Sequence, residues 1–277
     1  MLATHWPATP HPATTGEARD RPPIAKADGW VVAVRGVHGG AGTTTVAAHL
    51  AGAWARWGPG PVGLVDLAGG LARRLDLAPG VRIWTDLTAV AGRPDADLLW
   101  QMLTVGLAEP WPGLHVLPLA GLVDGSPEPA PDPALVEAVL GAGRLAWRLV
   151  VVDLPPAGAR QVDVALGAAE VLVAVGRCQS AGIGGVHAAL DGWSLAGRDD
   201  WSAGAVITGA QSRAPLAPRE ARAALGERLW ALIPADTLEL AAAAEDGMLL
   251  LDRPDLPAVQ AMIALANRIV PFPAQTG

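Results

Sequence analysis

A short apolar run leads into a glycine-rich turn, and a stretch with a helical pattern follows the turn at once. The run is 31–34, the turn carries Gly39, Gly40 and Gly42, and the helical pattern covers 44–57. Glycines at these positions let the backbone adopt positive φ and bring N–H groups close to an anion. This order of strand, glycine loop and helix N-terminus predicts a phosphate-binding loop, with a tight turn that holds no ligand as the alternative.

The loop lacks the lysine that neutralises the outer phosphates in a Walker A motif. Thr43 occupies the position of that lysine, and Lys26, which precedes the predicted strand, is the chain's only lysine. The backbone N–H groups and the helix N-terminus remain, and on their own they hold an anion only weakly. The sequence therefore predicts a nucleotide-hydrolase fold whose chemistry is reduced or abandoned.

The composition of this chain of 277 residues narrows its class. A net charge of −7 argues against nonspecific coating of DNA, which needs many Lys and Arg contacts to phosphates. Cys178 is the single cysteine, so no intrachain disulfide can form. The N-terminus lacks a signal-peptide pattern, and no apolar run approaches the roughly 20 residues that span a bilayer. We expect a cytoplasmic protein, while contact with a membrane surface stays open.

Apolar runs alternate with helical patterns from residue 29 onward. Residues 1–28 are predicted to be a disordered leader, and 29–277 a single domain. Apolar strands separated by helices are typical of a three-layer α/β/α fold with a mostly parallel, twisted sheet. The last helical pattern, 256–270, has one apolar face and is expected to pack on this domain. The predicted strands are 30–34, 62–67, 114–119, 149–154, 171–175, 205–208 and 229–233, and the other predicted helices are 157–169, 181–194, 218–225 and 237–245.

Two carboxylates stand where predicted strands end. Asp66 follows the apolar run 62–65, and Asp153 follows 149–152. Ligands of open α/β sheets bind at the carboxyl ends of the strands. A helix or loop cap is the alternative for each residue. Their occurrence together with the glycine loop favours a binding site.

Four segments resemble, in their order along the chain, the ParA/MinD superfamily of P-loop NTPases. Residues 38–45 resemble its deviant Walker A loop, Lys-Gly-Gly-x-Gly-Lys-Thr-Thr, and 62–68 resemble its second strand, which ends Asp-x-Asp. Residues 149–156 resemble its Walker B strand and the start of switch II, and 232–236 resemble the segment that borders the base.

Within the superfamily the chain is most similar to the CpaE/TadZ-like branch. The likeness is strongest to actinobacterial septum-site-determining proteins associated with Tad pilus secretion genes. Members of that branch also have Gly-Gly-Ala-Gly loops without lysine and a segment similar to 82–87.

The resemblance implies a site for ATP and Mg²⁺ at the interface of a homodimer. Thr44 would bind the metal, and Asp66 and Asp153 would reach it through water. The adenine-reading Asn of the family aligns with Thr208. The implied nucleotide-binding residues are His38, Gly39, Gly40, Ala41, Gly42, Thr43, Thr44, Thr45, Pro234 and Asp236.

Three positions depart from the family's pattern. His38 replaces the lysine that reaches the partner's nucleotide, Thr43 replaces the lysine inside the loop, and Ala68 replaces the carboxylate that orients the attacking water. Each lost charge-assisted hydrogen bond is worth roughly 1.5–3 kcal/mol. The departures predict weak or absent hydrolysis.

Several residues have two interpretations from sequence alone. His38 either supplies a partial positive charge to phosphate or faces solvent as an ordinary loop histidine. Arg35, at the end of the first strand, either swings toward phosphate or else caps a loop or pairs with a carboxylate. A loosely basic stretch either contacts DNA or forms a solvated helix face, and it contains Arg213, Arg219, Arg222 and Arg228.

The resemblance implies a positioning or scaffold protein that places pilus or secretion machinery, or a division septum, through protein contacts. A genuine slow Mg-ATP hydrolase acting as a dimerisation switch is the alternative. A DNA-partitioning protein is a further alternative, which the acidic composition disfavours.

Overall fold

The computed structural model describes residues 29–58, 60–77, 84–91, 96–105, 107–119, 129–157, 160–210, 218–235, 239, 242–243 and 246–271. The predicted leader 1–28 lies outside the described residues, as does Asp236. The predicted helix 237–245 lies mostly outside them.

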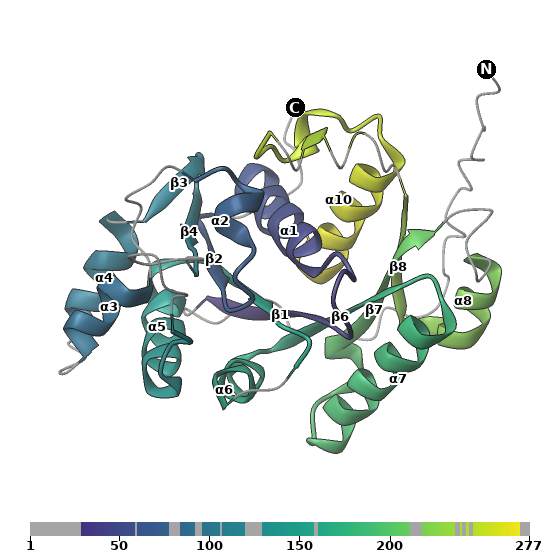
Figure 1. Ribbon diagram of the computed structural model, residues 1–277, viewed down its shortest axis with the longest axis horizontal. Coiled ribbons are helices and arrows are strands. Elements are labelled where there is room, and N and C mark those ends of the chain that lie inside the picture. The colour runs from purple at the N-terminus through teal and green to yellow at the C-terminus, as the bar shows by residue number, and fades with distance from the viewer. Residues whose placement is uncertain are drawn as a thin grey trace.

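An eight-stranded sheet forms the centre of the molecule, with strand order β3-β4-β2-β5-β1-β6-β7-β8 (Figure 1). All neighbouring strands are parallel except the edge pair of β3 and β4. The strands are β1 Trp30–Gly36, β2 Val62–Asp66, β3 Ala108–Trp111, β4 Leu114–Leu117, β5 Leu149–Leu154, β6 Val171–Arg177, β7 Ala203–Ala210 and β8 Leu229–Pro234.

Helices cover both faces of the sheet, which confirms the predicted three-layer α/β/α fold with a mostly parallel sheet (Figure 1). Side chains of β1 alternate between two cores, with Val31 in one and Val32 in the other. The first core packs against α3 Trp84–Ala91, α4 Ala96–Val105, α5 Pro133–Ala146, α6 Arg160–Ala168, α7 Ser180–Leu195 and α8 Pro218–Leu225. The second packs against α1 Thr43–Trp57, α2 Leu71–Arg74 and α10 Pro257–Ile269.

The C-terminal helix α10 packs on the domain through its apolar face, as predicted. Val259, Met262 and Ala266 are all fully buried. The indole N–H of Trp54 in α1 donates to the carbonyl of Ala266 at 3.1 Å. Helix α1, which follows the glycine loop, is therefore held in place by α10.

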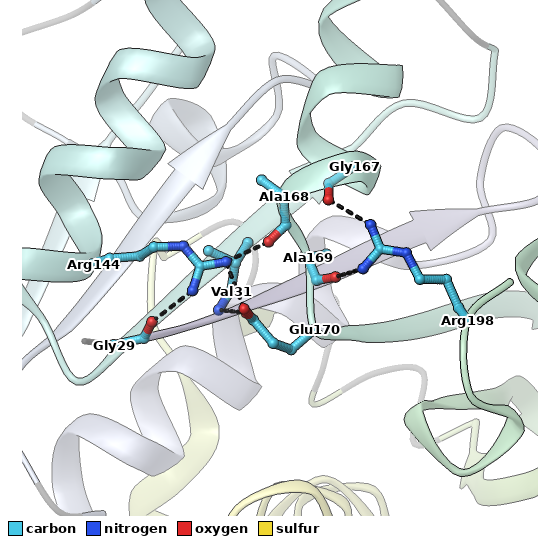
Figure 2. A network of polar contacts seen from close by, with 8 residues as sticks. All are labelled: Gly29, Val31, Arg144, Gly167, Ala168, Ala169, Glu170 and Arg198. Carbon is cyan, nitrogen blue, oxygen red and sulfur yellow. Dashed lines mark hydrogen bonds and ion pairs between the residues drawn. The ribbon is translucent and has the colours of Figure 1, made fainter. Parts of the chain in front are cut away.

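A polar network joins the start of β1 to the segment at the C-terminal end of α6 (Figure 2). Arg144 of α5 donates to the carbonyls of Gly29 and Ala168 and forms an ion pair with Glu170 at 2.7 Å. Glu170 accepts from the backbone N–H of Val31 at 2.8 Å. These contacts join the start of β1 to the C-terminus of α6.

A second arginine closes the same helix end. Arg198 donates to the carbonyls of Ala169, at 2.9 Å, and Gly167 (Figure 2). Its guanidinium also stacks on Trp193 at 5.1 Å from the ring centre. Cations at a helix C-terminus are favourable because the last carbonyls carry partial negative charge.

The imidazole of His49, a residue of α1, is fully buried. Its Nδ1–H donates to the carbonyl of Thr45 at 2.8 Å, and its Nε2 accepts from the N–H of Leu250 at 3.4 Å. Burial lowers the pKa of His49 to about 4, the bond to Thr45 raises it, and the charge of Arg74 lowers it. The ring is neutral and links α1 to η3 Leu250–Asp252.

We expect the protein to lose stability as the pH falls from about 6.5 toward 4. In this window the unfolded chain protonates His49 and the folded protein does not, so protons favour unfolding. Urea unfolding at pH 7 and pH 5 should show a drop that is about 2 kcal/mol smaller in His49→Gln than in the wild type. Equal drops in the two proteins would contradict the assignment.

Candidate phosphate-binding site

The glycine loop connects the end of β1 to the first turn of α1. Gly40 and Gly42 have positive φ, at 72° and 88°, which favours glycine at both positions. No side chain caps the N-terminus of α1. A Cβ added at Gly39 or Gly40 would meet nothing within 4 Å, so the space in front of the loop is open. The loop has the shape and the uncapped helix end that suit a bound anion.

Thr208 at the end of β7 holds the loop in place. Its hydroxyl donates to the carbonyl of Ala41 at 2.7 Å. Its side chain also lies 3.6 Å from the position of a Cβ on Gly42. The residue that aligns with the adenine-reading Asn therefore uses its hydroxyl within the protein.

His38 is held by backbone groups at both ring nitrogens. Nδ1–H donates to the carbonyl of Gly39 at 3.0 Å, and Nε2 accepts from the N–H of Arg177 at 3.4 Å. Through these two contacts His38 links the loop to β6.

Thr43, in the position of the missing lysine, turns its hydroxyl back toward β1. A side chain on Gly36 would collide with the Thr43 hydroxyl oxygen, so the two residues are in close contact. Thr43 is consequently too short and turned the wrong way to act as the lysine would.

Asp66 accepts three hydrogen bonds from the turn that follows β2. The N–H groups of Ala68 and Gly69 donate to Oδ1 at 2.9 and 2.7 Å, and the N–H of Leu71 donates to Oδ2 at 2.9 Å. Burial raises the pKa of Asp66, and these N–H groups lower it. The carboxylate shapes the turn as a cap, which was the alternative interpretation, while it lies beside the candidate metal position.

Asp153 at the end of β5 lies directly beside Asp66 in the sheet register. It is fully buried, and neither carboxylate oxygen has a hydrogen-bond partner of good geometry among the described residues. Burial and the neighbouring charge of Asp66 raise its pKa to about 8, while the nearby Thr44 hydroxyl lowers it. The structure thus holds a costly buried acid next to the first turn of α1.

A magnesium ion fits this position by its chemistry. Mg²⁺ prefers oxygen ligands and is commonly bound by one or two carboxylates together with substrate phosphates. Thr44 and Asp153 would hold it, with Asp66 behind them, and the ion would supply positive charge to phosphate oxygens. Among the described residues, no group of three or more His, Cys, Asp or Glu side chains is placed to hold a metal ion.

The other predicted residues are divided between the site and its surroundings. The exposed methyl group of Ala68 has no polar atom with which to orient water. Pro234 ends β8 beside Ala210, at the same edge of the sheet. Arg35 donates to the carbonyl of Pro156 at 3.2 Å, so it caps the segment after β5, as its second interpretation held. Arg228 pairs with Asp191 at 2.8 Å.

Arg177, at the end of β6, is a loop contact that the sequence analysis missed. Its Nη1 donates to the carbonyl of Gly40 at 3.3 Å. The available signal was an arginine that ends an apolar run, because the carboxyl ends of parallel strands meet at one edge of the sheet.

Two curated proteins resemble part of the chain in sequence. No family model matches the chain. The chain is 38% identical over 155 residues, or 54% of its length, to uncharacterized protein Rv3660c of Mycobacterium tuberculosis, and equally to uncharacterized protein MT3760 of another strain. The matched part spans 40% of the length of these curated relatives.

Solved structures with a similar fold include a ParA family ATPase and MinD cell division proteins. A ParA family ATPase from Chlorobium tepidum superposes with a TM-score of 0.71 and 18% identity over 87% of this chain and 98% of that chain. The chain has the ParA/MinD fold. The septum site-determining protein MinD from Pyrococcus horikoshii, complexed with Mg-ADP, superposes with a TM-score of 0.68 and 18% identity over 87% of this chain and 96% of that chain. MinD in the MinC:MinD complex of Aquifex aeolicus superposes with a TM-score of 0.67 and 19% identity over 90% of this chain and 98% of that chain.

Among the described residues, no helix is both long and apolar enough to cross a bilayer.

We expect Asp153→Asn to stabilise the metal-free protein. The folded protein keeps the Asp153 proton up to about pH 8 and the unfolded chain loses it near 3.8, so ionisation favours unfolding as the pH rises. Thermal unfolding in EDTA at pH 8 should show a gain of at least about 1.4 kcal/mol, the worth of one pKa unit.

The neighbouring Asp66→Asn is the matched control for this measurement. It should lose about 1–3 kcal/mol, because an amide nitrogen would face a backbone N–H that the carboxylate now satisfies. Destabilisation by Asp153→Asn as well would show that the Asp153 carboxylate has partners in the folded protein.

Proposed function

We propose that the protein is a ParA/MinD-like positioning or scaffold protein of the CpaE/TadZ-like branch, with a degenerate ATP site and weak or absent hydrolysis. The supporting observation is the combination of a complete glycine loop with Thr43 and Ala68 at the two positions that matter most for chemistry. It acts in the cytoplasm as a homodimer that meets across the glycine-loop face. Its partners are proteins of pilus or secretion machinery, or of cell division.

The weak chemistry follows from the charges around the loop. Phosphoryl transfer depends on positioning and on positive groups that face the developing negative charge. Thr43 turns away from the loop opening, and the Ala68 methyl cannot orient water. The charge-assisted bonds of two lysines, replaced here by His38 and Thr43, are lost, which weakens nucleotide binding by a factor on the order of a hundred or more.

A slow Mg-ATP hydrolase acting as a dimerisation switch is the second candidate. The buried Asp153 next to Thr44 favours it, because its oxygens have no hydrogen-bond partner of good geometry among the described residues and this pair matches what a magnesium ion needs.

We expect no steady-state hydrolysis of Mg-ATP by purified protein above the rate of Asp153→Ala. The measurement is phosphate release at millimolar ATP, since the site lacks both a loop lysine and a water-orienting carboxylate. Turnover that disappears in Asp153→Ala would instead support the slow hydrolase.

We expect a fluorescent fusion of the full chain to form discrete foci at cell poles or septa in the organism that encodes it. Deletion of the gene should misplace pili or septa, and imaging of the two structures separates a pilus role from a septum role. Uniform fluorescence with normal placement of both would contradict the positioning role.

Cell-wide nucleoid staining by the same fusion would point to the DNA-partitioning alternative. Its control is Arg219→Glu combined with Arg222→Glu on the exposed face of α8, which should abolish a salt-sensitive gel shift if DNA is bound.

A further inference from the structure

We propose that Arg177 supplies the positive charge of the phosphate loop in place of the absent lysine. Its ligand is the Mg²⁺-complexed pyrophosphate group of a nucleoside di- or triphosphate. This inference rests on the proposed function, because it takes the degenerate loop to be a site that still binds nucleotide.

The backbone places Arg177 at the loop. Arg177 is the last residue of β6, and β6 pairs with β1, the strand that leads into the loop. Its N–H donates to Nε2 of His38 at 3.4 Å. The next residue, Cys178, donates its N–H to the carbonyl of Thr208 at 2.9 Å, and Thr208 itself holds the loop at Ala41. The position of Arg177 is therefore set by the same contacts that shape the loop.

The guanidinium lies between two glycines. Nη1 donates to the carbonyl of Gly40 at 3.3 Å. Nη2 lies 3.5 Å from the position that a Cβ would take on Gly209, whose φ is +69°. Because neither glycine carries a side chain, the guanidinium rests against the rim of the loop.

The charge of Arg177 is available to an anion. The side chain is exposed, and none of the ion pairs among the described residues includes it. A guanidinium has five N–H donors, and the contact with Gly40 uses one. Its planar fork matches phosphate oxygens in pairs, which makes arginine well suited to phosphate recognition.

Other charged candidates near the loop are committed elsewhere. Arg35 donates to the carbonyl of Pro156, and both ring nitrogens of His38 contact backbone groups. Arg74 is buried and donates to the carbonyls of Ala243 and Met248. Across the described ranges, Arg177 is the cationic side chain that contacts the loop backbone.

An independent observation at the end of β5 points to a ligand of the same kind. Asp153 is completely buried beside Thr44, and its two oxygens have no donor of good geometry in the described part of the chain. A carboxylate in this state suits a bound cation. A hydroxyl and a carboxylate for a metal, with an arginine for phosphate, together match a magnesium–diphosphate group.

Calorimetric titration tests the proposal with Mg-ADP, Mg-ATP and Mg-pyrophosphate as ligands. Arg177→Gln should weaken nucleotide binding by about 10- to 100-fold, the effect of one lost charge-assisted bond. Arg177→Lys should keep part of the affinity. Arg35→Gln is the matched control, since it removes the same charge from the neighbouring strand end and should leave binding unchanged.

Three results would overturn the proposal. They are wild-type affinity in Arg177→Gln, equal losses in Arg177→Gln and Arg35→Gln, and no binding by the wild type at millimolar nucleotide. The last result would leave the positioning role standing, because cell imaging tests that role separately. Pyrophosphate binding as tight as that of ADP, and dependent on Arg177, would support the role of the arginine and overturn the nucleoside as the ligand.

Thermal unfolding gives a second readout on the same proteins. Mg-ADP should raise the melting temperature of the wild type and of Arg35→Gln, and should raise that of Arg177→Gln much less. Equal melting temperatures of the three proteins without ligand would show that an exposed substitution has not disturbed the fold. A nucleotide-induced rise in Arg177→Gln equal to that of the wild type would overturn the role of Arg177.

Discussion

Two buried carboxylates stand side by side at the ends of β2 and β5, and the architecture of the site depends on how each is treated. Asp66 is satisfied by backbone N–H groups and thereby builds the turn that leads into α2. Asp153 has no comparable donors among the described residues. Two charged carboxylates here would repel each other and would be costly to bury, so burial and the charge of Asp66 raise the pKa of Asp153. The fold keeps this arrangement at the one edge where a bound cation would relieve it.

The shape of the glycine loop and the positive charge beside it come from different residues. Shape comes from the positive φ of Gly40 and Gly42 and from the hydroxyl of Thr208, none of which needs a lysine. Charge at the rim comes from Arg177, which belongs to a different strand from the loop. A lysine at position 43 would belong to the first turn of α1, whereas Arg177 belongs to the end of β6. The two side chains would therefore approach a bound anion from different elements.

Sequence reasoning predicted the sheet well because its buried parallel strands are continuous apolar runs. Seven of the eight strands were predicted in their places, and β3, with the sequence Ala-Glu-Pro-Trp, was not, since it has no apolar run. Helices α3 and α4 carry apolar residues but lie between weak turn signals, so no element was predicted there. The closeness of Asp66 and Asp153 was predictable because the carboxyl ends of parallel strands meet at one edge of the sheet.

The contacts of individual side chains in the site could not be predicted in the same way. Arg177 is 137 residues along the chain from Gly40, and Thr208 is 167 residues from Ala41, so only the order of the strands in the sheet brings them to the loop. His38 was offered as a charge or as a solvent-facing residue, and the structure gives it a third role, as a fastener between loop and strand. Such roles depend on which rotamer packs against which carbonyl, and a single sequence does not carry that information.

The two arginines at the end of α6 have a mechanical consequence. Arg144 and Arg198 grip the last carbonyls of this helix from two sides, and Glu170 ties the same point to the start of β1 (Figure 2). The segment after Asp153 leads into the opposite end of α6. Because these contacts hold this end of α6 against β1, they oppose sliding of the helix along its axis. We therefore expect a displacement of the segment after β5 to be taken up at the start of α6.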